Sequence, residues 1–343
     1  MSVEELKQIA KAMVAPGKGI LAMDESHPTC GKRFKALGIP ETEEMRQAYR
    51  DMLVTTEGLS DYISGAILFD ETIRQTLLDG SPFPNYLSDN GIIPGIKVDA
   101  GAHPLAGHTD EKVTEGLDGL RARLNEYYDL GARFSKWRAV ITIGDHIPSW
   151  ACIEANAHAL ARYAKLSQEA GIVPIVEPEV LMDGTHSIER SYEVTELAQR
   201  ITFQHLHNQG VLMEGMILKP SMVISGASAS KRADVETVAK ETVRCLMNTV
   251  PANVPGIAFL SGGQSDEEAS SHLNAMHNLG IDLPWSLTFS YGRALQHASM
   301  TAWGGDSANV NEAQKVLLQR ARSNGKAALG DYSADAEKAA YSS

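Results

Sequence analysis

Short runs of apolar residues recur along the chain, and most of them lead directly into an ionisable side chain. The run Met216-Ile217-Leu218, for example, leads into Lys219, and Pro220 then ends the strand that this run predicts. Segments with helical periodicity separate the runs. Eight runs are candidate strands: residues 20–23, 63–69, 92–96, 134–135, 172–176, 216–218, 257–260 and 285–289.

The intervening segments carry the signals of helices. Residues 45–53 and 235–246 each contain an apolar stripe at the spacing of one helical face. Ser265-Asp266-Glu267-Glu268 is a capping-box pattern that predicts the start of a helix, and Gly280 is a typical helix stop.

Strands that are apolar on both faces and alternate with helices require a parallel sheet covered by helices. Eight such units predict an α/β fold, a single-domain (β/α)8 TIM barrel, with an open doubly wound sheet as the alternative. We assign residues 1–324 to the barrel as the catalytic domain. Residues 325–343, rich in Ala, Ser and Asp, are assigned to a mobile C-terminal tail.

The composition is that of an ordinary globular protein, with 43% hydrophobic and 22% charged residues. A net charge of −12 argues against nucleic acid and anionic membranes as partners, so an anionic ligand must meet a local cluster of positive charge.

No apolar run approaches the roughly 18 residues of a membrane span, and the acidic start lacks targeting features. Three cysteines, an odd number, indicate a reducing compartment. We expect a cytoplasmic protein, with a trimmed organellar form left open.

Ionisable residues at most strand ends are the main indication of a site, because barrel active sites lie at the carboxyl ends of the strands. Strand side chains alternate, so Lys136 and Arg138 share one face, as do Glu177 and Glu179. These pairs converge with Asp24, Lys97, Lys219 and Arg293. One such residue alone is explained by a buried ion pair, but the whole set favours a polar pocket. We expect Asp70, Glu71 and Asp99 to offset its positive charge.

The loops after the last two strands predict a phosphate site. Ser261-Gly262-Gly263 and Ser290-Tyr291-Gly292-Arg293 combine glycines, hydroxyl groups and a guanidinium. Barrels commonly hold phosphate at these loops. The alternative is a pair of ordinary turns beside a surface arginine.

Other motif-like patterns carry no function. The glycines of Gly17-Lys18-Gly19 precede a strand, whereas a dinucleotide-binding turn follows one. His205 and His207 face different ways on a predicted helix, and His103 and His108 have no obvious third ligand. We therefore predict no metal and no cofactor.

Together these residues resemble class I fructose-1,6-bisphosphate aldolases, the metal-free Schiff-base type. The matching segments lie between residues 17 and 305. They are Gly-Ile-Leu-Ala-Met-Asp-Glu-Ser at 19–26, Gly-Ile-Lys-Val-Asp at 95–99, Lys-Trp-Arg at 136–138, Val-Glu-Pro-Glu at 176–179, Leu-Lys-Pro at 218–220, Leu-Ser-Gly-Gly-Gln-Ser at 260–265 and Phe-Ser-Tyr-Gly-Arg-Ala-Leu at 289–295.

The resemblance implies a role for each matching position. Lys219 corresponds to the Schiff-base lysine, Glu177 to the acid/base that helps dehydrate the carbinolamine, and Glu179 to its hydrogen-bonding neighbour. Asp24 corresponds to the residue that takes the C4-hydroxyl proton, and Lys136 to the group that stabilises developing charge. Ser261, Gly262, Gly292 and Arg293 correspond to one phosphate site, and Lys97, Ser26 and Arg33 resemble the other. Arg138 and Ser290 are further substrate or phosphate contacts.

The resemblance further implies a homotetramer that acts on a sugar phosphate in glycolysis, gluconeogenesis or the Calvin cycle. Two departures stand out. Ala100 replaces a lysine that is common after Lys-Val-Asp, and the chain ends Ala340-Tyr341-Ser342-Ser343 where animal members end in tyrosine. The alternatives are a phosphosugar isomerase that uses Glu177 as a base, and a non-catalytic sugar-phosphate binder.

Overall fold

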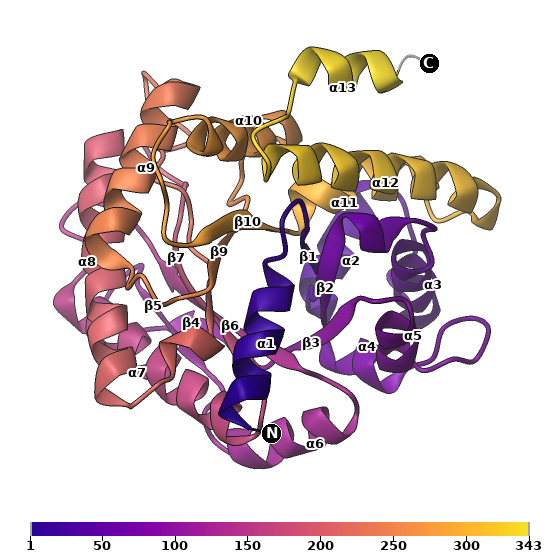
Figure 1. Cartoon of the computed structure of the whole chain (residues 1–343), viewed down its shortest axis with the longest axis horizontal. Coiled ribbons are helices and arrows are strands. Elements are labelled where there is room, and N and C mark those ends of the chain that lie inside the picture. Colours follow the sequence, from indigo (N-terminus) through magenta and orange to yellow (C-terminus); the bar gives the residue numbers. More distant parts are fainter. Residues whose placement is uncertain (1, 342–343) are drawn as a thin grey trace.

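A computed structural model describes residues 2–341, the last two of them by backbone alone, and eight parallel strands form a closed barrel within it (Figure 1). The strands follow one another around the barrel in the order β1-β10-β9-β8-β7-β6-β3-β2. Their bounds are β1 Gly19–Ala22, β2 Ile63–Leu68, β3 Ile93–Lys97, β6 Phe134–Ile141, β7 Val173–Val180, β8 Ile217–Leu218, β9 Gly256–Phe259 and β10 Ser286–Tyr291. The predicted (β/α)8 barrel is confirmed, and an open sheet is excluded because β1 pairs with both β2 and β10.

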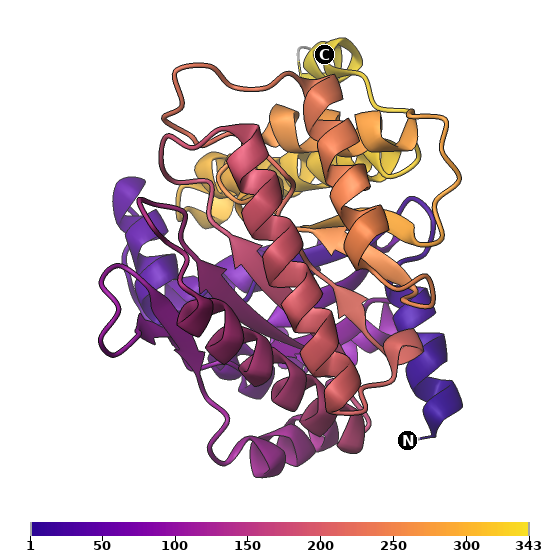
Figure 2. The same cartoon turned by 90° about the vertical axis from the view of Figure 1, so that its left-hand side faces the viewer.

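Helices cover the outside of the barrel (Figures 1 and 2). The α-helices are α1 Val3–Met13, α2 His27–Ala36, α3 Glu43–Val54, α4 Asp70–Arg74, α5 Phe83–Asp89, α6 Leu120–Asp129, α7 Trp150–Glu169, α8 Ile188–Asn208, α9 Val235–Thr249, α10 Asp266–His277, α11 Arg293–Trp303, α12 Val310–Ala327 and α13 Ala334–Tyr341, and the 3-10 turns are η1 Leu59–Asp61, η2 Met213–Gly215 and η3 Ser307–Asn309. The two predicted apolar stripes lie in α3 and α9. The capping box at Ser265 starts α10, which ends at His277, ahead of Gly280. Within residues 2–341, no helix has both the length and the apolar character needed to cross a membrane.

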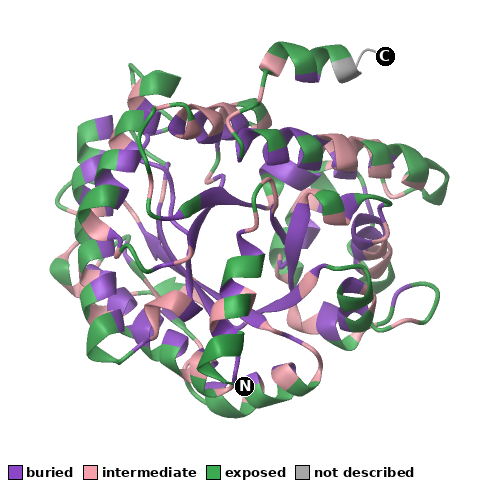
Figure 3. Ribbon diagram, viewed as in Figure 1, coloured by how far each residue is buried: buried purple, intermediate pink, exposed green. Residues whose placement is uncertain are grey.

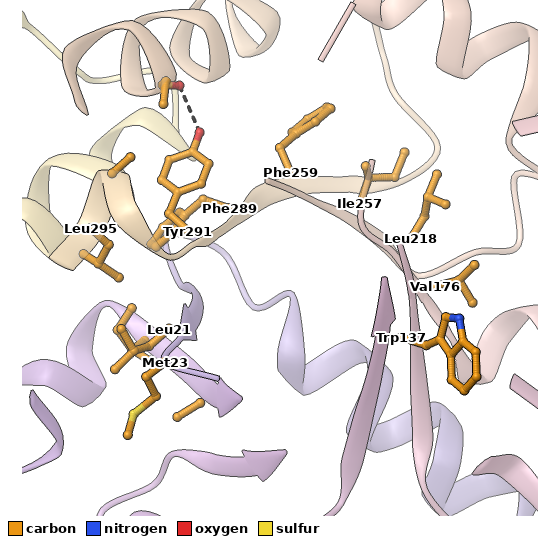
Figure 4. Packing of buried hydrophobic residues seen from close by; sticks show 14 of the residues in the cluster. Leu21, Met23, Trp137, Val176, Leu218, Ile257, Phe259, Phe289, Tyr291 and Leu295 are labelled. Atoms are coloured by element: carbon orange, nitrogen blue, oxygen red, sulfur yellow. Dashed lines mark hydrogen bonds between the residues drawn. The ribbon is translucent and has the colours of Figure 1, made fainter. Parts of the chain in front are cut away.

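Both faces of each barrel strand are buried, but against different partners. Outward-facing side chains such as Leu218, Phe259 and Tyr291 pack beneath the surrounding helices, and the Tyr291 hydroxyl donates to the Ala269 carbonyl of α10 at 2.9 Å (Figure 4). The exposed residues gather on the outer faces of the helices, whereas the barrel strands are buried almost throughout (Figure 3). This arrangement fixes which residues of each strand can point into the barrel.

The inward-facing residues near the strand beginnings are apolar and are closed off by α1. Leu6, Ala10 and Met13, on one face of α1, form a cluster with Phe134 and Ile217 from inside the barrel. Figure 1 shows α1 lying across this end of the barrel. The opposite end, where the strands finish, is therefore the end that remains open to a substrate.

A small antiparallel hairpin between β3 and α6 was not expected from the sequence. Its strands are β4 Gly101–Pro104 and β5 Lys112–Glu115. The buried side chain of Asn156 in α7 accepts from the amide N–H of Thr114 at 3.2 Å and donates to the carbonyl of Lys112 at 2.8 Å. The hairpin is thereby fastened to the barrel wall.

The C-terminal segment is in part helical. α12 continues to Ala327, so the expected boundary after residue 324 falls within its last turn. The carboxylate of Glu337 in α13 binds the buried guanidinium of Arg320 in α12 and accepts from the hydroxyl of Tyr332 at 2.7 Å. The side chain of Tyr341 lies outside the described residues, and the mobility of the tail stays a prediction.

We expect Glu337→Gln to lower the free energy of unfolding by about 3 kcal/mol, because it removes a buried carboxylate partner of Arg320. Urea denaturation measures this change. The matched control is Glu312→Gln, which removes the partner of exposed Lys315 and should cost less than about 0.5 kcal/mol. Equal losses in the two variants would contradict the docking of α13 by this ion pair.

Buried His272 in α10 gives the fold a dependence on pH. Its Nδ1 lies 2.6 Å from Oε1 of Gln264, at the end of the loop that follows β9. Burial lowers the pKa of His272 to about 4, so the folded state favours the neutral ring while the unfolded chain takes up a proton near pH 6.5.

From these pKa values, we expect the contribution of His272 to stability to be complete above pH 6.5 and to be lost as the pH falls toward 4, a change of about 3 kcal/mol. His272→Asn keeps a donor for Gln264 and should remove that part of the pH dependence. Unfolding free energies of both proteins at pH 7 and pH 4.5 measure the difference. Parallel pH profiles would show that the His272 ring does not titrate with folding.

Candidate active site

A cavity of about 960 Å³ opens at the carboxyl ends of the barrel strands. All of the site residues predicted from the sequence lie on its wall: Asp24, Ser26, Arg33, Lys97, Lys136, Arg138, Glu177, Glu179, Lys219, Ser261, Gly262, Ser290, Gly292 and Arg293. They come from strands, from loops and from two helices, α2 and α11, that lie far apart in the sequence. The fold therefore brings together groups that are far apart in the sequence.

Strand alternation explains why these side chains converge. In β6, Phe134 lies in the apolar interior cluster, and Lys136 and Arg138 follow it at intervals of two residues. In β7, Ile175 is likewise inside, and Glu177 follows two residues later. The sequence placed the ends of these strands earlier, but β6 continues to Ile141 and β7 to Val180. The charged residues are thus held within rigid strands.

Four charged side chains form the buried centre of the cavity. The Nζ of Lys136 lies 2.6 Å from Oδ2 of Asp24 and 3.5 Å from Oε2 of Glu177. The Nζ of Lys219 lies 3.4 Å from Oε1 of the same Glu177. Each of the four residues is less than one-tenth exposed. Glu177 therefore lies between two amino groups, one of which also contacts Asp24.

The pKa shifts in this cluster follow from burial and from charge. Burial opposes ionisation of Asp24, but the charges of Lys136 and Lys219 outweigh it and lower the pKa of Asp24 to about 2. Burial also opposes the charge on Lys136, yet Asp24 and Glu177 raise the pKa of Lys136 well above its usual range. At neutral pH, Asp24 is a carboxylate and Lys136 an ammonium. Within the described residues, Lys219 contacts one carboxylate, that of Glu177.

The loops after β9 and β10 have the geometry of an anion site. Gly262 and Gly263 have φ values of +56° and +104°, which L side chains rarely adopt. The hydroxyl of Ser290 is buried without a hydrogen-bond partner among the described residues. Arg293 is the first residue of α11, whose N-terminus has no side-chain cap. Free backbone N–H groups, a hydroxyl and a guanidinium therefore surround this part of the cavity.

On the other side of the cavity, the predicted basic residues already have acidic partners. Lys97 lies 2.6 Å from Asp99, Arg138 binds Glu179, and Arg33 binds Glu25. Glu179, expected beside Glu177, thus has Arg138 as its partner. The Ser26 hydroxyl lies 3.2 Å from that of Thr29.

The expectation that Asp70 and Glu71 would offset charge in the pocket is wrong. Neither residue lines the cavity, because both lie on α4 and turn toward arginines outside it. Asp70 binds Arg74, and Glu71 binds Arg46 and Arg50. Asp99 does line the cavity, so for this residue the expectation holds.

Glu25, Lys112 and Asp183 also line the cavity and were not predicted from the sequence. Lys112 lies on the unexpected hairpin, for which the β-branched pair Val113-Thr114 was the available signal. Of the histidines considered as ligands, His205 binds Glu154 at 3.0 Å outside the cavity. In the described part of the chain, no group of three or more His, Cys, Asp or Glu side chains has the arrangement of a metal site.

Comparison with known proteins shows similarity over nearly the whole chain. Residues 5–343 match the family model for fructose-bisphosphate aldolase class-I. A probable class 1 fructose-bisphosphate aldolase from Xanthomonas campestris is 63% identical, over 97% of this chain and 99% of the relative. The cytosolic fructose-bisphosphate aldolase 4 of Arabidopsis thaliana is 50% identical, over 97% of this chain and 85% of its own length.

A solved structure gives the same result for the fold. The fructose-bisphosphate aldolase of Plasmodium falciparum, crystallised with TRAP and a small-molecule inhibitor, superposes with a TM-score of 0.94. The two sequences are 49% identical, over 96% of this chain and 95% of that one. These matches favour the aldolase interpretation over an isomerase or a non-catalytic binder. The chain belongs to the class I fructose-bisphosphate aldolase family.

Proposed function

We propose that this chain cleaves fructose 1,6-bisphosphate reversibly to dihydroxyacetone phosphate and glyceraldehyde 3-phosphate through a Schiff base on Lys219. The observation that carries the proposal is the buried cluster in which Glu177 lies between the amino groups of Lys219 and Lys136. A nucleophilic amine needs a nearby group to receive and return protons, and this arrangement supplies one. The substrate class, a sugar phosphate, follows from the family.

In the first stage, the neutral amine of Lys219 attacks the C2 carbonyl of the substrate and forms a C–N bond. The carbinolamine then loses water to give an iminium ion. Glu177, at 3.4 Å from the amine, exchanges the protons that this dehydration requires. Lys136 is held by two carboxylates, so it remains an ammonium and supports the developing charge.

In the second stage, Asp24 removes the C4-hydroxyl proton and the C3–C4 bond breaks. The bonding electrons move to the iminium nitrogen and leave an enamine, while C4 becomes the carbonyl carbon of glyceraldehyde 3-phosphate. Protonation at C3 and hydrolysis then release dihydroxyacetone phosphate and regenerate Lys219. The low pKa of Asp24 keeps it ionised and able to accept the proton at neutral pH.

The two phosphate groups fit opposite sides of the cavity. Ser261, Gly262, Ser290, Gly292 and Arg293 form one group of contacts, and Lys97, Arg138, Ser26 and Arg33 form the other. Arg293 at the start of α11 favours the first group as an anion site. No metal or organic cofactor takes part in these steps.

The assembly and the location of the chain are also proposals. Resemblance to the class I aldolases supports a homotetramer, and exposed Trp150 and Leu197 on the neighbouring helices α7 and α8 offer apolar surface for subunit contacts. Similarity to a cytosolic plant aldolase supports a cytoplasmic location.

Borohydride reduction in the presence of dihydroxyacetone phosphate should attach the sugar irreversibly to Lys219, because reduction converts the iminium to a stable amine. Peptide mapping by mass spectrometry locates the adduct. EDTA should leave cleavage unchanged. An adduct elsewhere, no adduct, or cleavage retained by Lys219→Met would contradict the proposal, and a protein that isomerises the sugar phosphate without cleaving it would support an isomerase.

Asp24→Asn should separate Schiff-base formation from bond cleavage. We expect the rate of fructose 1,6-bisphosphate cleavage to fall by about 10²- to 10⁴-fold, the usual contribution of a positioned base. Borohydride trapping with dihydroxyacetone phosphate should persist, since that reaction has no C4 hydroxyl. Loss of both activities together would instead indicate that Asp24 acts only by holding Lys136 in place.

A further inference from the structure

Most of the positive charge in the cavity is already neutralised by protein carboxylates. Seven basic side chains line the wall, and five of them contact an acid: Arg33, Lys97, Lys136, Arg138 and Lys219. The other two, Lys112 and Arg293, form no ion pair with any residue between 2 and 341. Of the six acidic side chains on the wall, only Asp183 has no basic partner within the same part of the chain.

The two uncommitted basic side chains lie on opposite sides of the barrel mouth. Arg293 follows β10, which adjoins β9. Lys112 lies on the hairpin after β3, and the neighbouring Thr114 hydroxyl donates to the Arg138 carbonyl of β6 at 2.7 Å. In the closed order of eight strands, β9 and β10 lie opposite β6 and β3. Lys219 follows β8, which lies between these two sides, whereas Lys136 lies on β6 itself.

Lys112 has a fixed backbone and a free side chain. Buried Asn156 holds both the Lys112 carbonyl and the Thr114 amide, and the preceding Glu111 accepts from the amide of Ser149 at 2.6 Å. The side chain itself is exposed and borders the cavity. Binding of a ligand by its ammonium would therefore order only the side chain of Lys112, because the backbone is already fixed.

We propose that Lys112 binds the second phosphate of the substrate and sets the preference of this cavity for bisphosphates over monophosphates. This inference rests on the aldolase reaction proposed above and deepens it. A phosphate that binds Lys97, Arg138 or Arg33 competes with the carboxylate already bound to each. Lys112 adds a charge-assisted contact without such competition. Ala100, on the same wall, offers no charge.

The test compares cleavage of fructose 1,6-bisphosphate with cleavage of fructose 1-phosphate, which lacks the second phosphate. Lys112→Met should raise KM for the bisphosphate about tenfold, the value of one charge-assisted hydrogen bond. It should leave kcat/KM for the monophosphate unchanged. Lys112→Arg should retain the preference of the wild type. The control Lys315→Met removes an equal charge from an exposed position on α12 and should leave the cleavage of both substrates unchanged.

Two results would overturn the role of Lys112 while the aldolase reaction stands. One is an unchanged ratio of kcat/KM values for the two substrates in Lys112→Met. The other is an equal change in Lys315→Met, which would show that overall charge steers the substrate. Failure of the wild type to cleave either substrate would instead overturn the proposed function itself, and the inference with it.

Discussion

The ion pairs among Asp24, Lys136, Glu177 and Lys219 are the constraint on which the site depends. Burying a charge costs free energy unless an opposite charge lies close to it. The apolar interior of a barrel raises the free-energy cost of burial and also strengthens the attraction between paired charges. Lys136 meets this requirement with two carboxylates at 2.6 and 3.5 Å, whereas Lys219 has one at 3.4 Å. We propose that this difference in carboxylate contacts leaves Lys136 to organise charge and Lys219 to react with the substrate.

The barrel makes this arrangement possible by dividing its interior into two halves. α1 and the first inward residues of the strands form an apolar floor, and the later residues of the same strands carry the charges. At the proposed anion site, α10 and α11 begin directly where the loops after β9 and β10 end. Arg320 donates to the carbonyls of Asp266 and Ala294, so it ties the first turns of these two helices together.

The strands and many of the site residues could be predicted from the sequence, because they depend on the local order of apolar and charged residues. The strands could be predicted since both of their faces are apolar. Alternation showed that Lys136 and Arg138 share one face, as do Glu177 and Glu179, and their convergence followed once a barrel was expected. The true ends of β6 and β7 were hidden, because the charged residues inside them look like the start of a loop.

Long-range pairings could not be predicted from local pattern. Contacts such as Arg138 with Glu179 and Arg320 with Glu337 join residues that only the folded chain brings together. The β4–β5 hairpin was missed for a related reason: its strands are short, and the anchor that holds them, Asn156, lies on a later helix.

The most direct test of the central claim is a crystal structure of the enzyme soaked with fructose 1,6-bisphosphate and trapped during turnover. The account predicts a covalent bond between Nζ of Lys219 and C2 of the substrate, with Lys136 unmodified and still in contact with Asp24. An intact, non-covalent substrate in an active crystal, or a bond to Lys136, would contradict it.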